Sequence, residues 1–152
     1  MEKNNIINSS LIFIDEELST KDAIIKQIGD RAKEIGYVKD STSYCDSVLK
    51  REEEVSTAIG YAIAIPHGKT DDVLKPFIAF YRSVKPFQWT KEVDEKVQLI
   101  FQIGVPETGT EKLHLKFISE VSKRLLDEEF RNQLLTLTDK EKIYDLLISI
   151  NI

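Results

Sequence analysis

Residues that build covalent cross-links and metal sites are scarce in this sequence. Its 152 residues include one cysteine, Cys45, and two histidines, His67 and His114. One cysteine cannot form an intramolecular disulfide, and a structural zinc ion takes four nitrogen or sulfur ligands. A single cysteine is typical of a protein that works in a reducing cytoplasm, which is the location we expect. We expect no metal and no cofactor.

Long apolar runs and an excess of basic residues are missing as well. No stretch approaches the roughly 18–20 apolar residues that cross a bilayer, so we expect no direct membrane insertion. Residues 1–8 also lack the apolar run of a signal peptide. The formal net charge of −5 argues against a nucleic-acid partner, because such partners require a basic face. The 41% hydrophobic and 31% charged residues are typical of a globular domain, and we expect a single domain over residues 1–152.

The glycine-rich motifs of nucleotide and hydrolase sites do not occur. Residues 68–70 (Gly-Lys-Thr) match the end of a P-loop, but that motif needs a glycine five positions before Gly68, and position 63 is isoleucine. Neither G-x-G-x-x-G nor G-x-S-x-G is found. No pair of carboxylates stands at a spacing that indicates glycosidase or metal chemistry. The sequence therefore excludes the common nucleotide-binding and hydrolase motifs.

The most informative stretch is residues 62–68, Ala-Ile-Ala-Ile-Pro-His-Gly. Four small or β-branched apolar residues predict the end of a buried strand. Pro66 has no N–H, so it should end the ladder or leave it at an edge, and Gly68 should turn the backbone with a positive φ. We therefore expect His67 on an open turn directly after a rigid strand. The alternative is a Pro-His-Gly turn without a function.

Hydrophobic periodicity predicts four strands and five helices along the chain. Strands are expected at residues 11–14, 62–65, 76–82 and 97–105, and helices at 20–35, 42–54, 110–126, 127–135 and 139–148. Caps for four of these helices are expected at Ser19, Thr110, Asp127 and Thr138. Cys45 and Trp89 are expected in the core. Helices before and after a run of strands predict an α+β fold with a mixed sheet covered on both faces, in the order β-α-α-β-β-β-α-α-α.

Three side chains could carry chemistry: His67, His114 and Arg51. A neutral imidazole is a nucleophile near pH 7 and needs no general base. If it accepts a phosphoryl group, the anionic oxygens need donors. Arg51 would supply a guanidinium, and His114, in the first turn of a predicted helix, would lie at the positive end of the helix dipole.

Each of these residues also has a simpler interpretation. His114 could be a satisfied core histidine, and Arg51, which precedes three glutamates, could form a surface ion pair of small energetic value. Thr57 could serve only to form a turn. The joint occurrence favours phosphoryl transfer, but the sequence does not show that these residues meet in space.

Residues 51–68 follow the pattern R-E-x4-T-x2-G-x2-I-A-I-P-H-G, which resembles the signature of the fructose/mannitol-type EIIA domain of the bacterial sugar phosphotransferase system. The likeness continues through Trp89, residues 97–106, His114 and residues 125–131, and covers roughly residues 9–150. Tyr61 departs from the pattern, because relatives commonly carry a small residue after the glycine. The resemblance implies a three-layer α/β/α sandwich on a small mixed β-sheet.

The resemblance also implies a phosphotransferase that works through a phosphohistidine. His67 would accept a phosphoryl group from phospho-HPr and pass it to a cysteine of an EIIB component, while a membrane EIIC component moves the sugar. Arg51 and His114 would assist at the phosphoryl group, and Gly68 and Thr57 would bind it. Cys45 is not the expected acceptor, because no EIIB domain is present.

Two other functions remain open at this stage. In a nitrogen-type regulatory module, phosphorylation of His67 would gate binding to a regulator or transporter. In a weaker alternative, the chain would be a fold relative without phosphotransfer, such as a cytosolic domain of an anion transporter. The resemblance leans towards fructose, but galactitol, mannitol and similar polyols stay open, because in this system EIIC contacts the sugar.

Overall fold

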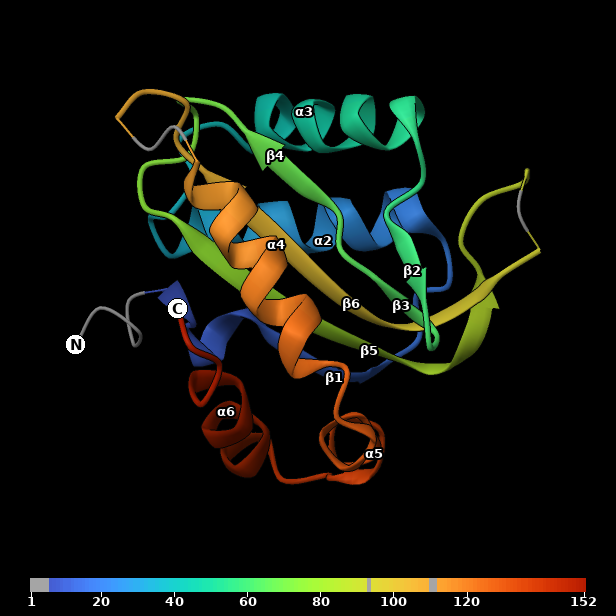
Figure 1. The fold of residues 1–152 in the computed structure, drawn as a ribbon. Helices are drawn as coiled ribbons and strands as arrows, with labels where there is room; N and C mark the ends of the chain where they lie inside the picture. The colour runs from blue at the N-terminus through green and yellow to red at the C-terminus, as the bar shows by residue number, and fades with distance from the viewer. Residues whose placement is uncertain (1–5, 93, 110–111) are drawn as a thin grey trace.

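The computed structural model describes residues 6–92, 94–109 and 112–152. A mixed sheet forms the middle of the molecule (Figure 1). Within the described ranges its strands are β1 (Ile12–Glu16), β2 (Ala58–Gly60), β3 (Ile63–Ala64), β4 (His67–Lys69), β5 (Phe77–Gln88) and β6 (Lys96–Val105). They run in the order β1-β5-β6-β3-β2, and β4 pairs with β6 beyond the end of β3. The β1–β5, β3–β6 and β4–β6 pairs are parallel, whereas the β5–β6 and β2–β3 pairs are antiparallel.

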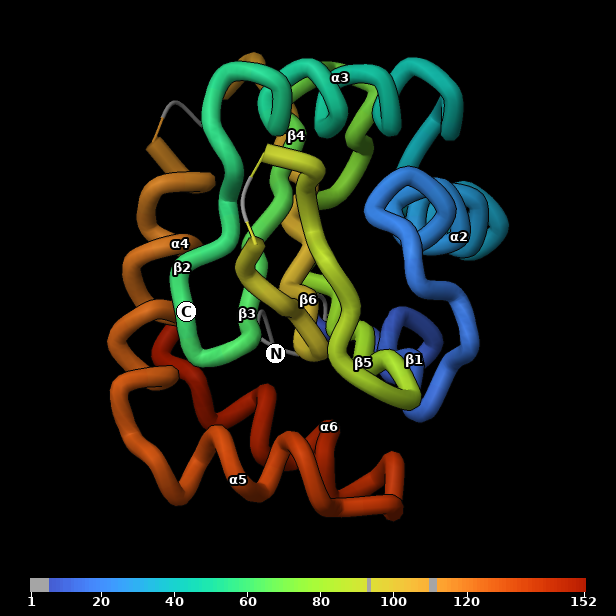
Figure 2. Tube along the Cα trace, turned by 90° about the vertical axis from the view of Figure 1, so that its right-hand side faces the viewer, coloured from blue at the N-terminus to red at the C-terminus, as the bar shows by residue number. Residues whose placement is uncertain are grey.

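Helices cover both faces of this sheet. The first face carries α2 (Lys21–Glu34) and α3 (Ser41–Glu54), and a short 3-10 helix, η1 (Ser9–Leu11), precedes β1. The second face carries α4 (Leu113–Arg124), α5 (Glu128–Thr136) and α6 (Lys140–Ile148). Figure 2 shows the strands between α2 and α4. The predicted three-layer α/β/α sandwich is confirmed.

Two apolar cores hold the layers together, one on each face. On the first face, Ile24, Ile28 and Val48 pack with the sheet residues Tyr81 and Ile100. On the second face, the buried side chains of α4, α5 and α6 pack against the other face of the same strands. These include Phe117, Val121, Phe130, Ile143 and Leu147 from the helices, and Phe80, Phe101 and Ile103 from the sheet. Alternating strand residues thus supply both cores, so the sheet is buried on both sides.

The predicted element order was short by two strands. Among the described residues, five strands lie between the two groups of helices, because β2 and β4 form where turns were expected. The strand β2 has three residues, and the strand after Pro66 has three as well. Elements this short give little periodicity in sequence. The strand expected at residues 76–82 also continues to Gln88, past a register shift between Arg82 and Phe87.

Pro66 interrupts the sheet for one position only. Its carbonyl oxygen still accepts a hydrogen bond from the N–H of Ile103, at 2.9 Å. The chain then resumes a parallel ladder, in which His67 lies opposite Ile103 and Gly68 opposite Gly104. The expectation that His67 would stand on an open turn is therefore wrong. A proline removes one donor, but the long strand β6 can still pair with the residues beyond it.

Gly68 is required for space and not for a turn. The described glycines with positive φ are Gly36, Gly60 and Gly109, so the positive φ predicted for Gly68 is wrong. A Cβ at Gly68 would lie 2.9 Å from Cγ2 of Val48 and 3.2 Å from Cε1 of Tyr44. The absence of a side chain therefore lets β4 approach α3 closely.

Helix boundaries and caps agree with the sequence in part. Asp127 caps α5 as predicted, with its carboxylate accepting from the N–H groups of Glu129 and Phe130. For α2 the cap is Thr20 and not Ser19, and for α6 it is Asp139 and not Thr138. These two caps are one residue later than predicted, because the neighbouring side chain, of similar chemistry, is the one that reaches a free N–H group of the first turn. Thr110 lies outside the described residues, and α4 begins at Leu113 after Lys112, which forms no side-chain cap.

Cys45 and Trp89 are both buried, with 8% and 3% of their surfaces exposed. The Sγ atom of Cys45 lies 3.5 Å from the carbonyl oxygen of Ile25, and burial raises the pKa of this thiol to about 11. The predicted core positions are confirmed. None of the described helices combines the length and the apolar character needed to cross a membrane.

Candidate functional site

His67 is held at the first position of β4 by a local hydrogen bond. Its side chain is half-buried, and its Nδ1 atom lies 3.1 Å from the carbonyl oxygen of Ile65. A carbonyl oxygen can only accept, so this contact places a proton on Nδ1. In the neutral ring the lone pair is then on Nε2, which is the nitrogen able to act as a nucleophile.

His114 lies beside His67 although α4 begins well after β6 ends. The two ring centroids are 6.0 Å apart and the planes are inclined by 31°. The Nδ1 atom of His114 is buried and has no hydrogen-bond partner among the described groups. A satisfied core histidine would have that nitrogen paired, so this observation favours a role at the site over the simpler interpretation of His114. The structure brings together the two histidines that the sequence proposed.

Burial lowers the pKa of both histidines below the ordinary value of 6.5. For His67, burial has the largest effect on the pKa. The hydrogen bond to Ile65 has the next largest and raises the pKa, and the charge of Arg51 then lowers it. For His114, burial again has the largest effect, and the charges of Lys69 and His67 lower the pKa further. Burial thus favours the neutral form of both imidazoles, which is the form that a nitrogen nucleophile needs.

Arg51 is in the last turn of α3, within electrostatic reach of His67. Its Nη1 atom donates to the carbonyl oxygen of Val55 at 3.0 Å. Among the described side chains Arg51 forms no ion pair with the glutamates that follow it, so the surface ion pair is not observed. The guanidinium thus caps the end of its own helix and lowers the pKa of the nearby His67.

The hydroxyl of Thr57 is engaged by a residue that the sequence analysis missed. Thr57 is buried and its Oγ1 donates to Oε2 of Glu52. The other carboxylate oxygen of Glu52 accepts from Nε1 of Trp89, at 3.0 Å, and from the N–H of Thr57, at 3.4 Å. The phosphate-binding roles of Thr57 and Gly68 stay predictions. Glu52 could have been noticed because it follows the buried Val48 by four residues, which places it on the same face of α3.

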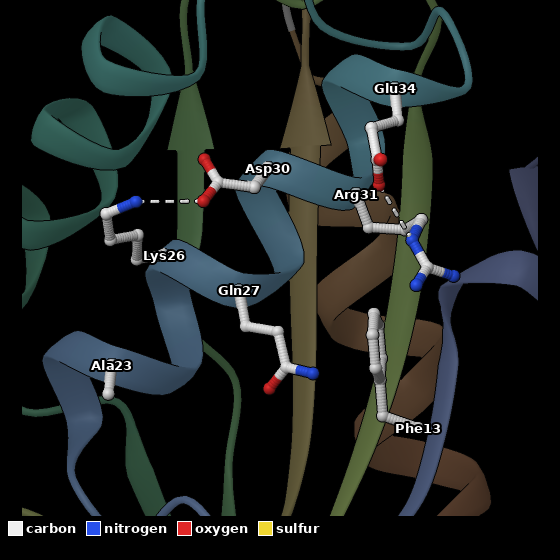
Figure 3. A pocket seen from close by; sticks show the side chains of 7 residues that line it. All are labelled: Phe13, Ala23, Lys26, Gln27, Asp30, Arg31 and Glu34. Atoms are coloured by element: carbon white, nitrogen blue, oxygen red, sulfur yellow. Dashed lines mark hydrogen bonds and ion pairs between the residues drawn. The ribbon is translucent and has the colours of Figure 1, made fainter.

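The hollow shown in Figure 3 is separate from this site. It lies on α2 and is lined by Phe13, Ala23, Lys26, Gln27, Asp30, Arg31 and Glu34. The exposed pairs Lys26–Asp30 and Arg31–Glu34 cross it. No histidine contributes to it. Within residues 6–92, 94–109 and 112–152, no group of three or more His, Cys, Asp or Glu side chains could hold a metal ion.

The chain matches one protein family over most of its length. Residues 5–150 match the family described as phosphoenolpyruvate-dependent sugar phosphotransferase system, EIIA 2. The chain belongs to this family. EIIA 2 proteins are phosphoryl carriers of the sugar phosphotransferase system, and the predicted function is confirmed at this level.

Curated relatives of this EIIA 2 chain include proteins described by their sugar. A PTS system fructose-specific EIIA component of Haloferax volcanii is 37% identical over 140 residues, which are 92% of this chain and 90% of that protein. A fructose-like EIIA component of Escherichia coli is 32% identical over 112 residues, 74% of this chain and 75% of that protein. The fructose-specific EIIABC component of Bacillus subtilis is 32% identical over 97% of this chain, but the match spans only 23% of that longer protein.

Solved structures of the same fold include a sugar-specific and a regulatory protein. The nitrogen regulatory protein IIA-Ntr of Neisseria meningitidis has a TM-score of 0.82 at 27% identity, and covers 93% of this chain and 96% of its own. IIA mannitol of Escherichia coli has a TM-score of 0.78 at 26% identity, and covers 92% of this chain and 97% of its own. A complex of enzyme IIA mannitol with phosphorylated enzyme IIB mannitol matches with a TM-score of 0.79 at 25% identity, over 95% of this chain and 99% of that one.

Proposed function

We propose that His67 carries the phosphoryl group on Nε2. The observation that supports this most directly is the contact between Nδ1 of His67 and the carbonyl oxygen of Ile65, 3.1 Å long. The lone pair of Nε2 attacks phosphorus in the donor phosphohistidine, and the electron pair of the broken P–N bond returns to the donor imidazole. In the second transfer an acceptor thiolate attacks phosphorus, and the electron pair of the P–Nε2 bond returns to His67.

The neighbouring groups stabilise the charge on the transferred phosphoryl group. Arg51 supplies a guanidinium whose charge already acts on His67. His114, with a ring centroid 6.0 Å from that of His67 and an unpartnered Nδ1, donates to a phosphoryl oxygen. Thr57 supports the site indirectly, because its hydroxyl and its N–H already donate to Glu52, and Gly68 follows His67 in the ladder between β4 and β6. Such preorganised donors are the main contribution a protein makes to phosphoryl transfer.

The donor is phospho-HPr and the acceptor is a cysteine of an EIIB component, on the cytoplasmic side of a membrane EIIC component. The solved complex of IIA mannitol with phosphorylated IIB mannitol supports the EIIB partner. The fused EIIABC relative of Bacillus subtilis supports a shared pathway with EIIB and EIIC. The fructose-specific and fructose-like relatives support a fructose-type sugar.

Incubation with phosphoenolpyruvate, Enzyme I and HPr tests the first transfer. Mass spectrometry should find one acid-labile phosphoryl group on the wild-type protein and none on the His67→Gln variant. His114→Gln should be phosphorylated more slowly while its melting temperature stays close to that of the wild type. A phosphoryl group that persists in His67→Gln, or an unmodified wild type, would overturn the proposal.

A regulatory module is the second candidate, and the likeness to IIA-Ntr favours it. In that function the phosphorylation state of His67 controls binding to a regulator or transporter, and no sugar is moved. The phosphorylated protein should be offered an EIIB domain encoded by the same organism. Transfer of phosphate to the EIIB cysteine supports the sugar carrier. No transfer, together with capture of a transporter or transcription factor by one phosphorylation state only, supports the regulatory module.

A further inference from the structure

Glu52 is a buried acidic residue that the phosphoryl chemistry does not use directly. Only 4% of its surface is exposed. Its carboxylate accepts three hydrogen bonds, from the hydroxyl and the N–H of Thr57 and from Nε1 of Trp89. Burying a carboxylate costs free energy that a well-packed apolar side chain would avoid. A charge at this position therefore calls for an explanation beyond packing.

The hydrogen bonds of Glu52 continue to the nucleophile. The carbonyl oxygen of Thr57 accepts from the N–H of Ile65 at 3.1 Å. The carbonyl oxygen of Ile65 in turn lies 3.1 Å from Nδ1 of His67. A series of hydrogen bonds thus connects Glu52 to the imidazole of His67 through two intermediate residues, Thr57 and Ile65.

The segment that this path crosses is short and lies at the edge of the sheet. Residues 55–57 connect α3 to β2 without belonging to either, and β2 is an edge strand of three residues with an irregular register against β3. In the turn after β2, Tyr61 and Ala62 have φ values of +58° and +63°, which are unfavourable for residues other than glycine. The side chain of Glu52 is thus the contact that ties the start of this hairpin to α3.

We propose that Glu52 is the positioning residue of the His67 site. Its carboxylate fixes Thr57, and the carbonyl oxygen of Thr57 holds the N–H of Ile65. The carbonyl oxygen of Ile65 then holds the imidazole with its proton on Nδ1 and its lone pair on Nε2. The link to phosphoryl transfer rests on the proposed function, whereas the effect on the imidazole tautomer does not. The same contacts hold the end of α3 in place, and Arg51 precedes Glu52 in the last turn of that helix.

Two substitutions at Glu52 and one control test the proposal. Glu52→Leu replaces the charge by an apolar side chain and removes all three acceptor contacts. Glu52→Gln keeps one acceptor oxygen and removes the charge. Glu53→Gln, at the exposed neighbouring glutamate, removes the same charge without touching the path. Because Trp89 is the sole tryptophan of the sequence, near-ultraviolet circular dichroism of its indole reports whether the contact with Glu52 is lost.

Nitrogen-15 NMR of the two imidazoles in the unphosphorylated protein provides the decisive measurement. We expect the wild type and Glu53→Gln to hold His67 in the Nδ1–H tautomer. Glu52→Gln should show a partial mixture and Glu52→Leu a full mixture of tautomers, while the shifts of His114 change little. The rate of phosphoryl acceptance should fall roughly 10- to 100-fold in Glu52→Leu, as for other groups that orient a reacting atom.

The outcomes separate this proposal from the function on which it partly rests. A folded Glu52 variant that keeps the Nδ1–H tautomer and the wild-type rate would overturn the role of Glu52. If Glu52→Leu does not fold, Glu52→Gln decides the question by the same two measurements. A tautomer change in a protein that HPr does not phosphorylate would support the positioning role and overturn the proposed function.

Discussion

The carbonyl oxygen of Ile65 lies 3.1 Å from Nδ1 of His67, two residues later in the chain. This contact crosses Pro66, the residue whose missing N–H interrupts the sheet between β3 and β4. Pro66 keeps the register, because its carbonyl oxygen accepts from the N–H of Ile103. The imidazole of His67 is thus held by the strand residue that precedes the proline.

This contact predicts the chemical form of the phosphohistidine. With Nδ1 protonated and bonded to Ile65, the phosphoryl group should be attached to Nε2. Phosphorus-31 and nitrogen-15 NMR of the phosphorylated protein distinguish the two isomers. A phosphoryl group on Nδ1 would contradict the prediction, because it could form only after this hydrogen bond breaks.

A side chain at Gly68 should destabilise the fold. In Gly68→Ala the new Cβ would lie 2.9 Å from Cγ2 of Val48, so α3 must shift or the strand must bend. We expect a loss of about 1–3 kcal/mol in the free energy of unfolding, measured in urea. In the Val48→Ala background the same substitution should cost less, because the clashing methyl group is gone. Equal costs in the two backgrounds would show that the clash is not with Val48.

The buried Arg82 should contribute more stability than an exposed ion pair. Its Nη1 donates to the carbonyl oxygens of Leu134 and Leu137, at 2.8 and 2.7 Å, and its Nη2 lies 3.0 Å from Oδ1 of Asp15. Arg82→Met leaves both carbonyls at the end of α5 without this donor, so we expect a loss of about 2–4 kcal/mol in the free energy of unfolding.

The matched control for Arg82 is Lys123→Met, which breaks the exposed pair with Glu120 on α4. Urea denaturation should find a change of about 0–1 kcal/mol for this control. Similar losses in the two variants would mean that Arg82 acts as a surface charge and does not hold α5 against the sheet.

The stability of the protein should fall as the pH drops below about 6.5, the ordinary pKa of histidine. Burial lowers the pKa of His67 and His114 in the folded state. Between those lowered values and 6.5 the unfolded chain binds more protons than the folded protein, so the free energy of unfolding increases with pH across this window. Urea denaturation of the wild type between about pH 5 and pH 7.5 measures the slope.

The double variant His67→Gln/His114→Gln should show a shallower slope over the same range. The carboxyl groups of Asp30 and Asp71 do not contribute to the slope in this pH range, because their pKa values are lowered from 3.8. An unchanged slope in the double variant would show that other groups cause the pH dependence.

Elements with a long periodic pattern could be predicted from the sequence. The helix α3 was expected over residues 42–54 and runs over Ser41–Glu54, and β6 was expected over residues 97–105 and runs over Lys96–Val105. In both cases a buried stripe repeats often enough to identify the element. The strands β2 and β4 were missed, because three residues cannot show a period and their pairing depends on a partner far away in the chain.

The site could be predicted in its members but not in its contacts. His67 was identified from the Pro-His-Gly stretch, and the pairing with His114 required the resemblance to a known family. Glu52 was part of the family pattern but was given no role, because it stands in a run of three glutamates of which only Glu52 is buried. Only helix packing distinguishes these three residues of identical type.

The sequence by itself determined the fold class and the candidate nucleophile, because both follow from local patterns. These patterns are helices on either side of a run of strands, and an apolar strand that leads into Pro66 and His67. The tertiary structure alone decided which nitrogen of His67 is free. That choice depends on a carbonyl oxygen at 3.1 Å, and on a buried carboxylate at Glu52 that anchors the segment leading to it. Hydrogen bonds depend on the distance and direction between groups, which only the packing of the chain establishes.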